Sequence, residues 1–360
     1  MMMGNFIKSF FVICLVLFSS VSFSQEKYNL DSIEKNIDQY MTYFSENNPG
    51  AVVAVMKKGD ILFNKSYGLS NVNQNKTLQN SEAFNLANLS KMFTAFAVFQ
   101  LAEKNKLNPD QSLTDIFPGF PDYGSQVKIH HLMNHTSGLK GFDTKELSTN
   151  EDVLEFLKEQ KETNFNSGEK WEYSNADYPL LVKIIEQVSG KSYSEYLSKR
   201  IFKKIKTDHT FFVEDKMAHS NIAAGHIKEN DQYVVTDESN LIYGEQGIFM
   251  HAEDFAKWDK ALYTNKLLDC EPLSEFFTRG KLNNGENIPS YYGYGLVLME
   301  KNDERYWWHG GSSMDGYTNM YLHFPNHELT VLILSNRQDG YDFLKMAIYI
   351  AKLFEKEIKL

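Results

Sequence analysis

Strand-forming segments lie at both ends of this chain, and a long stretch of mostly helical periodicity separates them. β-rich runs flank "KKGD", where Gly59 supplies a hairpin turn, and the last third contains "YGYGLVLME", "ERYWWHG", "TNMYLHF" and "LTVLILSN". From Asn88 to about Lys206 the apolar residues recur mostly at helical spacing. This order predicts an α/β (α+β) fold: an antiparallel sheet built from both chain ends, an inserted helical subdomain, and a ligand cleft between the two parts.

Two helices are expected outside this helical middle. The segment "DSIEKNIDQYMTYFSEN", residues 31–47, starts with a capping aspartate, Asp31, and carries apolar residues on one side. It therefore predicts a surface helix before the first strand. A closing helix is expected from about Tyr341 to Lys356.

Length and composition fit one folded domain after an N-terminal leader. The chain has 360 residues, 42% of them hydrophobic and 14% aromatic, which is enough to bury a sizeable core. The sequence shows no internal repeat, low-complexity tract or long linker. The expected division is a leader at 1–24 and one domain at 25–360, with a sheet part at 25–87 and about 236–360 and a helical part at about 88–235.

The first 24 residues have the pattern of an export signal. One positive charge, Lys8, precedes an apolar run, and small residues stand before Gln25. The apolar run is shorter than the roughly 20 residues of a membrane span, so we predict cleavage before Gln25 and a secreted or periplasmic protein. An uncleaved membrane anchor is the alternative. Cleavage removes Cys14 and leaves Cys270 without a disulfide partner in the chain.

Charge and motif content exclude several classes of partner. The formal net charge of −10 becomes −11 without Lys8, which disfavours nucleic acid and anionic membranes. The sequence contains no P-loop, HExxH or paired-cysteine pattern. His131 and His135 stand four apart, but no third ligand accompanies them. We therefore predict no metal, no cofactor and no nucleic-acid partner, and oligomerisation stays open.

The first of three chemical constellations lies in "FNLANLSKMFTAFAV", Phe84 to Val98. Its apolar spacing predicts an amphipathic helix that places Asn88 and Lys91 on one face. With serine in place of Asn88 the pattern is S-x-x-K, in which a lysine whose pKa is lowered by burial removes the hydroxyl proton. The Asn–Lys pair is the remnant of such a pair, a working variant of it, or a solvated pair on a helix.

The second constellation is "WEYSNADYPLL", in which Tyr173 and Asn175 stand two apart. A Y-x-N loop can present a phenol as proton carrier and an amide as partner for a substrate carbonyl. The alternatives are that Tyr173 packs in the core and that Asn175 caps the following helix, which Gly190 ends.

The third constellation is "YWWHGGSSMDGY", in which an aromatic strand leads into His309, Gly310 and Gly311. The glycines let a ligand approach the backbone, and the histidine adds a polar or cationic group at the rim. An ordinary strand end with a glycine turn is the alternative.

Taken in order, "NLSK", "YSN" and "HGG" resemble the three site motifs of the serine β-lactamase and penicillin-binding-protein family, in its class C-like, esterase-related branch. Four stretches between or beside them are also similar to that family: "VKIHHLMNHTSGL", "GKSYSEYLSKRIFKKI", "GEQGIFMHAEDFAKWDKALYTNKLL" and "YGYGLVLM". The resemblance runs from about Gly50 to Asn336 and implies a β-lactamase/transpeptidase-like fold.

The resemblance also implies a role for each motif residue. Asn88 falls at the nucleophile's position, and the backbone N–H groups of Asn88 and Ser312 correspond to the oxyanion hole. Two features, "KKIKTDHT" and Asp315, depart from the family pattern at the cleft rim. The positions implied as catalytic are Asn88, Lys91, Tyr173 and His309, and those implied as substrate-binding are Asn175, Gly310, Gly311 and Ser312.

An asparagine at the nucleophile's position changes the expected function. The lone pair of an amide nitrogen is delocalised, and the nitrogen has no proton that a lysine could remove near neutral pH, so Asn88 cannot form an acyl-enzyme as serine does. Ser90 is expected to point away from Lys91. We therefore expect a secreted β-lactamase-related protein that binds an acyl, peptide-like or ester ligand with little or no hydrolysis. The alternatives are a hydrolase in which Lys91 and Tyr173 activate water, and an interaction protein with a vestigial cleft.

Overall fold

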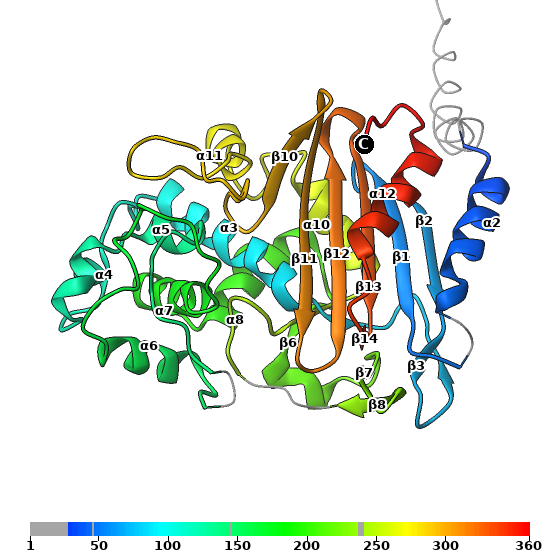
Figure 1. Ribbon diagram of the computed structural model, residues 1–360, viewed down its shortest axis with the longest axis horizontal. Coiled ribbons are helices and arrows are strands. Elements are labelled where there is room, and N and C mark those ends of the chain that lie inside the picture. Colours follow the sequence, from blue (N-terminus) through cyan, green and yellow to red (C-terminus); the bar gives the residue numbers. More distant parts are fainter. Residues whose placement is uncertain (1–27, 45–46, 144–145, 237–240) are drawn as a thin grey trace, which may run out of the picture.

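The computed structural model describes residues 28–44, 47–143, 146–236 and 241–360. Its main feature is a six-stranded antiparallel sheet with the order β10-β11-β12-β13-β1-β2 (Figure 1). The strands are β1 (Ala51–Lys57), β2 (Asp60–Tyr67), β10 (Val297–Lys301), β11 (Glu304–Ser313), β12 (Tyr317–Phe324) and β13 (Leu329–Ser335). The predicted α/β class, with an antiparallel sheet built from both chain ends, is confirmed.

The β1–β2 hairpin forms at the predicted turn. Lys58 and Gly59 connect the strands with φ angles of 51° and 74°, both in the left-handed region that favours glycine. β1 is buried along nearly its whole length, because both faces of the sheet are covered. This explains why its sequence, "AVVAVMK", is a continuous apolar run rather than an alternating one.

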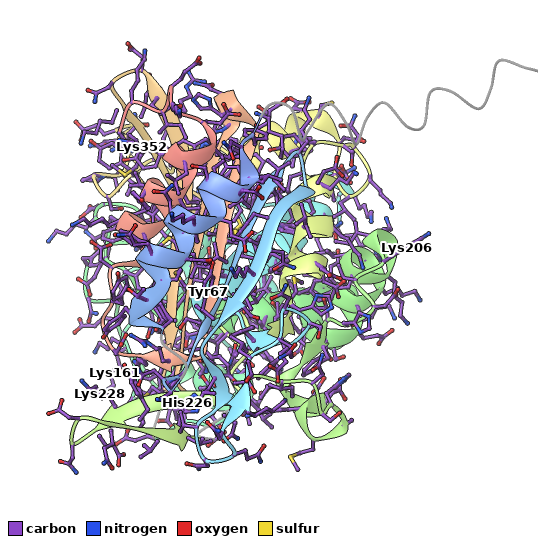
Figure 2. All side chains as sticks on the ribbon, turned by 90° about the vertical axis from the view of Figure 1, so that its right-hand side faces the viewer. Tyr67, Lys161, Lys206, His226, Lys228 and Lys352 are labelled. Carbon is purple, nitrogen blue, oxygen red and sulfur yellow. The ribbon has the colours of Figure 1, made fainter. Side chains whose placement is uncertain are left out.

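Helices α2 (Leu30–Tyr40) and α12 (Phe343–Phe354) cover one face of the sheet (Figures 1 and 2). Figure 2 shows Tyr67 on the sheet beside α2, where its hydroxyl donates to Asp38 Oδ1 at 2.8 Å. α2 is shorter than predicted. The side chain of Asn29, rather than that of Asp31, caps its first turn, and a 3₁₀ turn over residues 41–43 follows it.

The opposite face of the sheet carries α10 and the 3₁₀ turn at residues 87–89 that leads into α3, and the remaining helices lie beyond them (Figure 1). The helices of this side are α3 (Ser90–Glu103), α4 (Leu113–Ile116), α5 (Ile129–Met133), α6 (Asn150–Lys158), α7 (Asp177–Ser189), α8 (Tyr193–Leu197), α9 (Lys203–Ile205), α10 (Ala252–Ala261) and α11 (Cys270–Phe276). Within the described ranges, no helix combines the length and apolar composition needed to cross a membrane.

Three small sheets join the larger parts. They are β3 (Leu69–Asn71) with β4 (Lys76–Thr77), β14 (Arg337–Gln338) with β7 (Gly225–Glu229) and β8 (Gln232–Thr236), and β5 (Phe84–Asn85) with β9 (Ile248–Met250) and β6 (Phe211–Phe212). β5 immediately precedes the turn that carries Asn88, so its pairing with β9 helps to fix that turn.

The prediction that most of Phe84–Val98 is helical holds from Ser90 onwards, but the expected amphipathic character and a helix that includes Asn88 were wrong. The first residues form β5, residues 87–89 form a 3₁₀ turn, and α3 begins at Ser90. α3 is buried on all sides from Ser90 to Leu101, because α7 and α11 pack against it and the aromatic side chains of α10 pack on its Phe93 and Phe96. A helix covered all round shows no polar stripe, and its apolar spacing therefore does not reveal which face meets the core.

Candidate functional site at the start of α3

The turn that carries Asn88 is held in an unusual backbone conformation. Ala87 has a φ of +48°, which a side-chain-bearing residue rarely adopts. Asn85 supports it: its Oδ1 accepts hydrogen bonds from the N–H groups of Ala87 at 3.0 Å and Gly247 at 3.3 Å. Its Nδ2 donates to Asp315 Oδ2 at 2.9 Å. Asp315, which departs from the family pattern, therefore helps to fix the turn before Asn88.

Strand β11 passes directly beside this turn at Gly311. A Cβ on Gly311 would lie 2.7 Å from the backbone nitrogen of Asn88, so a larger residue cannot fit without moving the turn. The next residue, Ser312, directs its N–H to Asn88 Oδ1 at 3.3 Å. The two backbone groups implied as oxyanion donors thus lie on adjacent segments, and one of them already donates to the Asn88 amide.

The other end of the Asn88 amide contacts Tyr173. Asn88 Nδ2 donates to Tyr173 Oη at 3.0 Å, so the carboxamide spans the distance between the Ser312 N–H and the Tyr173 hydroxyl. Tyr173 is 39% exposed, Ser312 is exposed and Asn88 is half-buried. A ligand can therefore reach this point from solvent.

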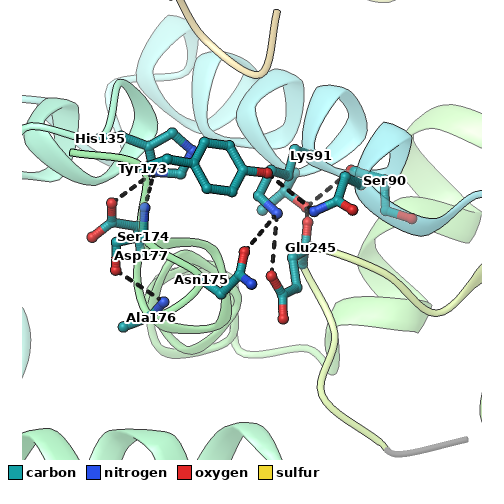
Figure 3. Close-up of polar contacts among 12 residues, drawn as sticks. Ser90, Lys91, His135, Tyr173, Ser174, Asn175, Ala176, Asp177 and Glu245 are labelled. Atoms are coloured by element: carbon teal, nitrogen blue, oxygen red, sulfur yellow. Dashed lines mark hydrogen bonds and ion pairs between the residues drawn. The ribbon is translucent and has the colours of Figure 1, made fainter. Parts of the chain in front are cut away.

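Lys91 lies beneath the exposed residues and is fully buried. Its Nζ is 3.2 Å from Glu245 Oε2 and 3.5 Å from Asn175 Oδ1 (Figure 3). Burial lowers the pKa of Lys91, but Tyr173 and Glu245 together raise it more, so the net pKa is above its ordinary value. Lys91 is therefore an ammonium group at neutral pH.

Sequence reasoning did not single out Glu245 as a site residue. It lies in "GEQG", between Gly244 and Gly247, whose φ angles of 100° and 94° mark a backbone conformation that favours glycine. Glu245 is 5% exposed, and its ion pair with Lys91 offsets part of the free-energy cost of burying a charged carboxylate. An acidic residue between two glycines was the one feature of the sequence that could have pointed to this site. Its distance from Lys91 along the chain gave no indication that the two residues are in contact.

The sequence predicted His309 at the rim of the cleft, but in the structure this histidine is buried. Its Nδ1 donates to the Gly310 carbonyl oxygen at 2.7 Å, so its Nε2 accepts from the Tyr292 hydroxyl at 3.1 Å. Burial, with the charge of Lys91, lowers the pKa of His309 to about 3. A neutral imidazole at this place orients Tyr292 and Gly310 rather than supplying a positive charge.

His135 supports the loop that carries Tyr173. Its ring centre is 4.3 Å from that of Tyr173, and its carbonyl oxygen accepts from the Glu172 N–H at 3.0 Å. Its Nδ1 is 2.8 Å from Asp177 Oδ2 (Figure 3). Sequence reasoning considered His135 solely as half of a metal pair, because the contact with Asp177 joins segments 42 residues apart.

Helix α7 begins at Asp177, and Ala176 occupies its cap position without a side-chain cap. The alternative in which Asn175 caps this helix is therefore wrong, since Asn175 instead turns its Oδ1 towards Lys91. Gly190 ends the helix with a φ of 67°, as predicted. The structure thus brings Asn88, Lys91, Tyr173, Asn175 and Ser312 together at one place.

The fold, with these three motifs meeting at the start of α3, defines a protein of the β-lactamase and penicillin-binding-protein class. A family model described as "Beta-lactamase" matches residues 33–354, and the chain belongs to that family. Penicillin-binding protein 4* of Bacillus subtilis (strain 168) is 31% identical over 318 residues, which span 82% of this chain and 69% of that protein.

Solved structures are similar over nearly the whole chain. The octameric penicillin-binding protein homologue from Pyrococcus abyssi has a TM-score of 0.80 at 26% identity and covers 92% of this chain and 78% of its own. FmtA from Staphylococcus aureus has a TM-score of 0.78 at 21% identity, and the match covers 92% of this chain and 89% of the FmtA chain. At this identity the similarity shows a shared fold alone.

Proposed function

We propose that this protein binds an acyl, peptide-like or ester ligand at the start of α3 without acyl-enzyme turnover. The observation that carries the proposal is the Asn88 carboxamide, which lies between the Ser312 N–H and the Tyr173 hydroxyl. The amide nitrogen is delocalised and cannot attack a carbonyl carbon as a serine hydroxyl does. The binding groups around it remain in place.

The protonation of Lys91 also disfavours the alternative in which water is activated directly. A general base must carry a free lone pair at the working pH. Because the pKa of Lys91 is raised, its amine is protonated and its charge is paired with Glu245. The ammonium group instead stabilises electron-rich atoms nearby, which suits the binding of a polarised carbonyl.

Ligand binding requires a small rearrangement of Asn88. A ligand carbonyl oxygen takes the Ser312 N–H from Asn88 Oδ1, and the 3.3 Å separation marks a weak bond that is easily exchanged. The exposed Tyr173 hydroxyl then serves as a second polar contact. The site therefore selects ligands with a carbonyl flanked by a further hydrogen-bonding group.

Neighbouring glycines provide a matched test of this binding mode. Gly311→Ala places a Cβ 2.7 Å from the Asn88 nitrogen, whereas Gly310→Ala meets the flexible end of Met320 at 3.2 Å. The ligands to test are a β-lactam, a D-alanyl-D-alanine peptide and a short ester. For each ligand that binds the parent protein, Gly311→Ala should weaken binding by about tenfold or more, and Gly310→Ala should weaken it much less.

Isothermal titration calorimetry and thermal-shift measurements on the parent and both variants check this prediction. Equal affinity in the two variants would contradict a ligand held by the Asn88–Ser312 region. If no ligand of these classes shifts the melting temperature of the parent, the hypothesis of an interaction protein with a vestigial cleft replaces the hypothesis of ligand binding.

We also propose export with processing before Gln25. The supporting pattern lies in residues 1–24, outside the described residues, and consists of Lys8, the apolar run and the small residues that follow it. Intact-mass measurement of the protein purified from its native cells should give a chain that begins at Gln25. A mature chain that retains residues 1–24 would overturn the proposal.

A further inference from the structure

Helix α10 carries a fully buried carboxyl group, that of Asp259, on the side that meets the sheet. Its Oδ1 accepts a hydrogen bond from the hydroxyl of Thr330 on β13 at 2.7 Å. Its Oδ2 is buried and has no hydrogen-bond partner among the described residues. Buried carboxyl groups are normally paired on both oxygens, so this one is sensitive to whether it carries a proton.

Asp259 has no counter-charge comparable to the one that Lys91 provides for Glu245. Among the described residues, the one basic side chain within 4.0 Å of it is His323, whose Nδ1 is 3.9 Å from Asp259 Oδ1. The Thr330 hydroxyl donates to Asp259, so its oxygen accepts from His323 Nδ1 at 2.8 Å. Burial lowers the pKa of His323 to about 3, so its ring is neutral. Ionised Asp259 is therefore a buried negative charge without a cation, which is costly.

The other polar groups around Asp259 come from each element packed against this part of α10. Burial, and then the charge of Asp259, raise the pKa values of Tyr263, just beyond α10, and Tyr321 on β12. Both phenol hydroxyls are buried, and neither has a hydrogen-bond partner among the described residues. The charged side chains of the two nearby turns are paired with one another or with α10 at the surface: Lys58 with Glu328 at 2.7 Å, and Asp60 with Lys260 at 2.6 Å.

These surroundings make the proton on Asp259 a source of stability. Burial raises the pKa of Asp259 to about 7, and hydrogen bonds from Thr330 and the Gly59 backbone lower it in part. The pKa of an aspartate in an unfolded chain is about 3.9. The folded protein therefore holds this proton more tightly than the unfolded chain. The stabilisation is complete below the unfolded pKa and is lost as the pH rises through the folded pKa.

We propose that Asp259, Thr330, Tyr263 and Tyr321 form a pH-sensitive clamp that holds α10 on the sheet while Asp259 is protonated and loosens when Asp259 ionises. The protonated carboxyl group can donate from Oδ2 to a phenol oxygen while Oδ1 keeps its hydrogen bond from Thr330. Ionisation removes that donor and leaves the charge inside the protein.

The position of α10 connects the clamp with the site at the start of α3. α10 follows β9 after a single residue, and β9 pairs with β5, which precedes the turn that carries Asn88. The Ile248 carbonyl oxygen on β9 accepts from the Leu86 N–H at 2.8 Å. A looser α10 should therefore also loosen β9. The inference does not depend on the function proposed for the α3 site.

The test compares the parent with Asp259→Asn, whose carboxamide has the shape and the donor of the protonated carboxyl group. Urea denaturation of both proteins is measured from pH 5 to pH 7.5. Relative to Asp259→Asn, the folding equilibrium constant of the parent should fall by at least about tenfold over this range. Hydrogen exchange of the α10 and β9 amides should rise with pH more in the parent than in the variant. The ratio of the two proteins at each pH cancels the intrinsic pH dependence of exchange.

Asp254→Asn is the matched control, because Asp254 is an equally buried carboxyl group of α10 but is paired with Lys257 at 2.8 Å. This variant should keep the pH dependence of the parent. If Asp259→Asn does not fold, Thr330→Val provides a second test. It removes a hydroxyl that lowers the pKa of Asp259, so it should destabilise the protein more at pH 8 than at pH 5.

Three results would overturn the proposal. The first is an equal response of the parent and Asp259→Asn to pH. The second is a loss of pH dependence in Asp254→Asn as large as that in Asp259→Asn. The third is exchange of the α10 amides that rises no more in the parent than in Asp259→Asn. If Thr330→Val is used instead, an equal loss of stability at pH 5 and pH 8 overturns it.

Discussion

Asn88→Ser should become an ester hydrolase and react covalently with a serine-directed phosphonate, whereas the parent should do neither. The new hydroxyl would stand beside Tyr173, and the backbone N–H groups of residues 88 and 312 already lie next to each other. Loss of the nucleophile in a comparable hydrolase costs on the order of a million-fold, so we expect a gain of at least about 10³-fold on an activated ester. The measurements are burst-phase kinetics with p-nitrophenyl acetate and the mass of the phosphonate adduct.

The gained rate should rise with pH. Burial lowers the pKa of Lys91, but Tyr173 and Glu245 raise it above its ordinary value, so the neutral amine that accepts the serine proton is scarce at pH 7. Each rise of one pH unit below that pKa increases the neutral amine about tenfold. A rate independent of pH between 7 and 9 would exclude Lys91 as the proton acceptor.

Two controls accompany Asn88→Ser. Asn88→Ala removes the amide without adding a nucleophile and should stay inert, and Ser90→Ala should change nothing in either background. A parent that already hydrolyses the ester at ordinary enzyme rates, and loses that activity on Lys91→Ala, would favour the direct-water mechanism. If Asn88→Ser folds but remains inactive, the site differs from that of an active hydrolase by more than the missing serine hydroxyl.

Lys91→Met should destabilise the protein by about 3–5 kcal/mol, because it leaves the buried carboxyl of Glu245 without its counter-charge. Changing both partners, as in Lys91→Met/Glu245→Gln, should restore most of this free energy of unfolding. Lys260→Met is the matched control, since Lys260 pairs with Asp60 at 59% side-chain exposure and its loss should cost about 0–1 kcal/mol. Urea denaturation of the four proteins measures these differences.

The destabilisation of Lys91→Met should also depend on pH. Burial raises the pKa of Glu245, and Lys91 opposes that rise in the parent. Without Lys91 the folded protein holds the Glu245 proton more tightly than the unfolded chain, so stability falls as pH rises from the unfolded pKa of about 4.3 through the folded pKa. The loss should therefore be smaller at pH 5.5 than at pH 8. A double variant as unstable as the single one would contradict the ion-pair explanation and indicate lost packing.

Local sequence patterns identified much of the architecture. The "KKGD" turn, the apolar runs of the last strands and the helix end at Gly190 depend on residues near one another in the chain, so each could be predicted. α3 could not be placed correctly, because its burial on every side results from segments distant in sequence. The leader at 1–24, the domain boundaries and the roles of the site residues stay predictions.

The sequence by itself determined which family motifs the chain carries and which one lacks its serine, because motif identity is a property of neighbouring residues. The tertiary structure decided the electrostatics around those motifs. Glu245 reaches Lys91 across 154 residues and, with Tyr173, keeps it charged, and Tyr292 meets a buried, neutral His309. A pKa depends on burial and on charges nearby in space, and neither can be read from spacing along the chain.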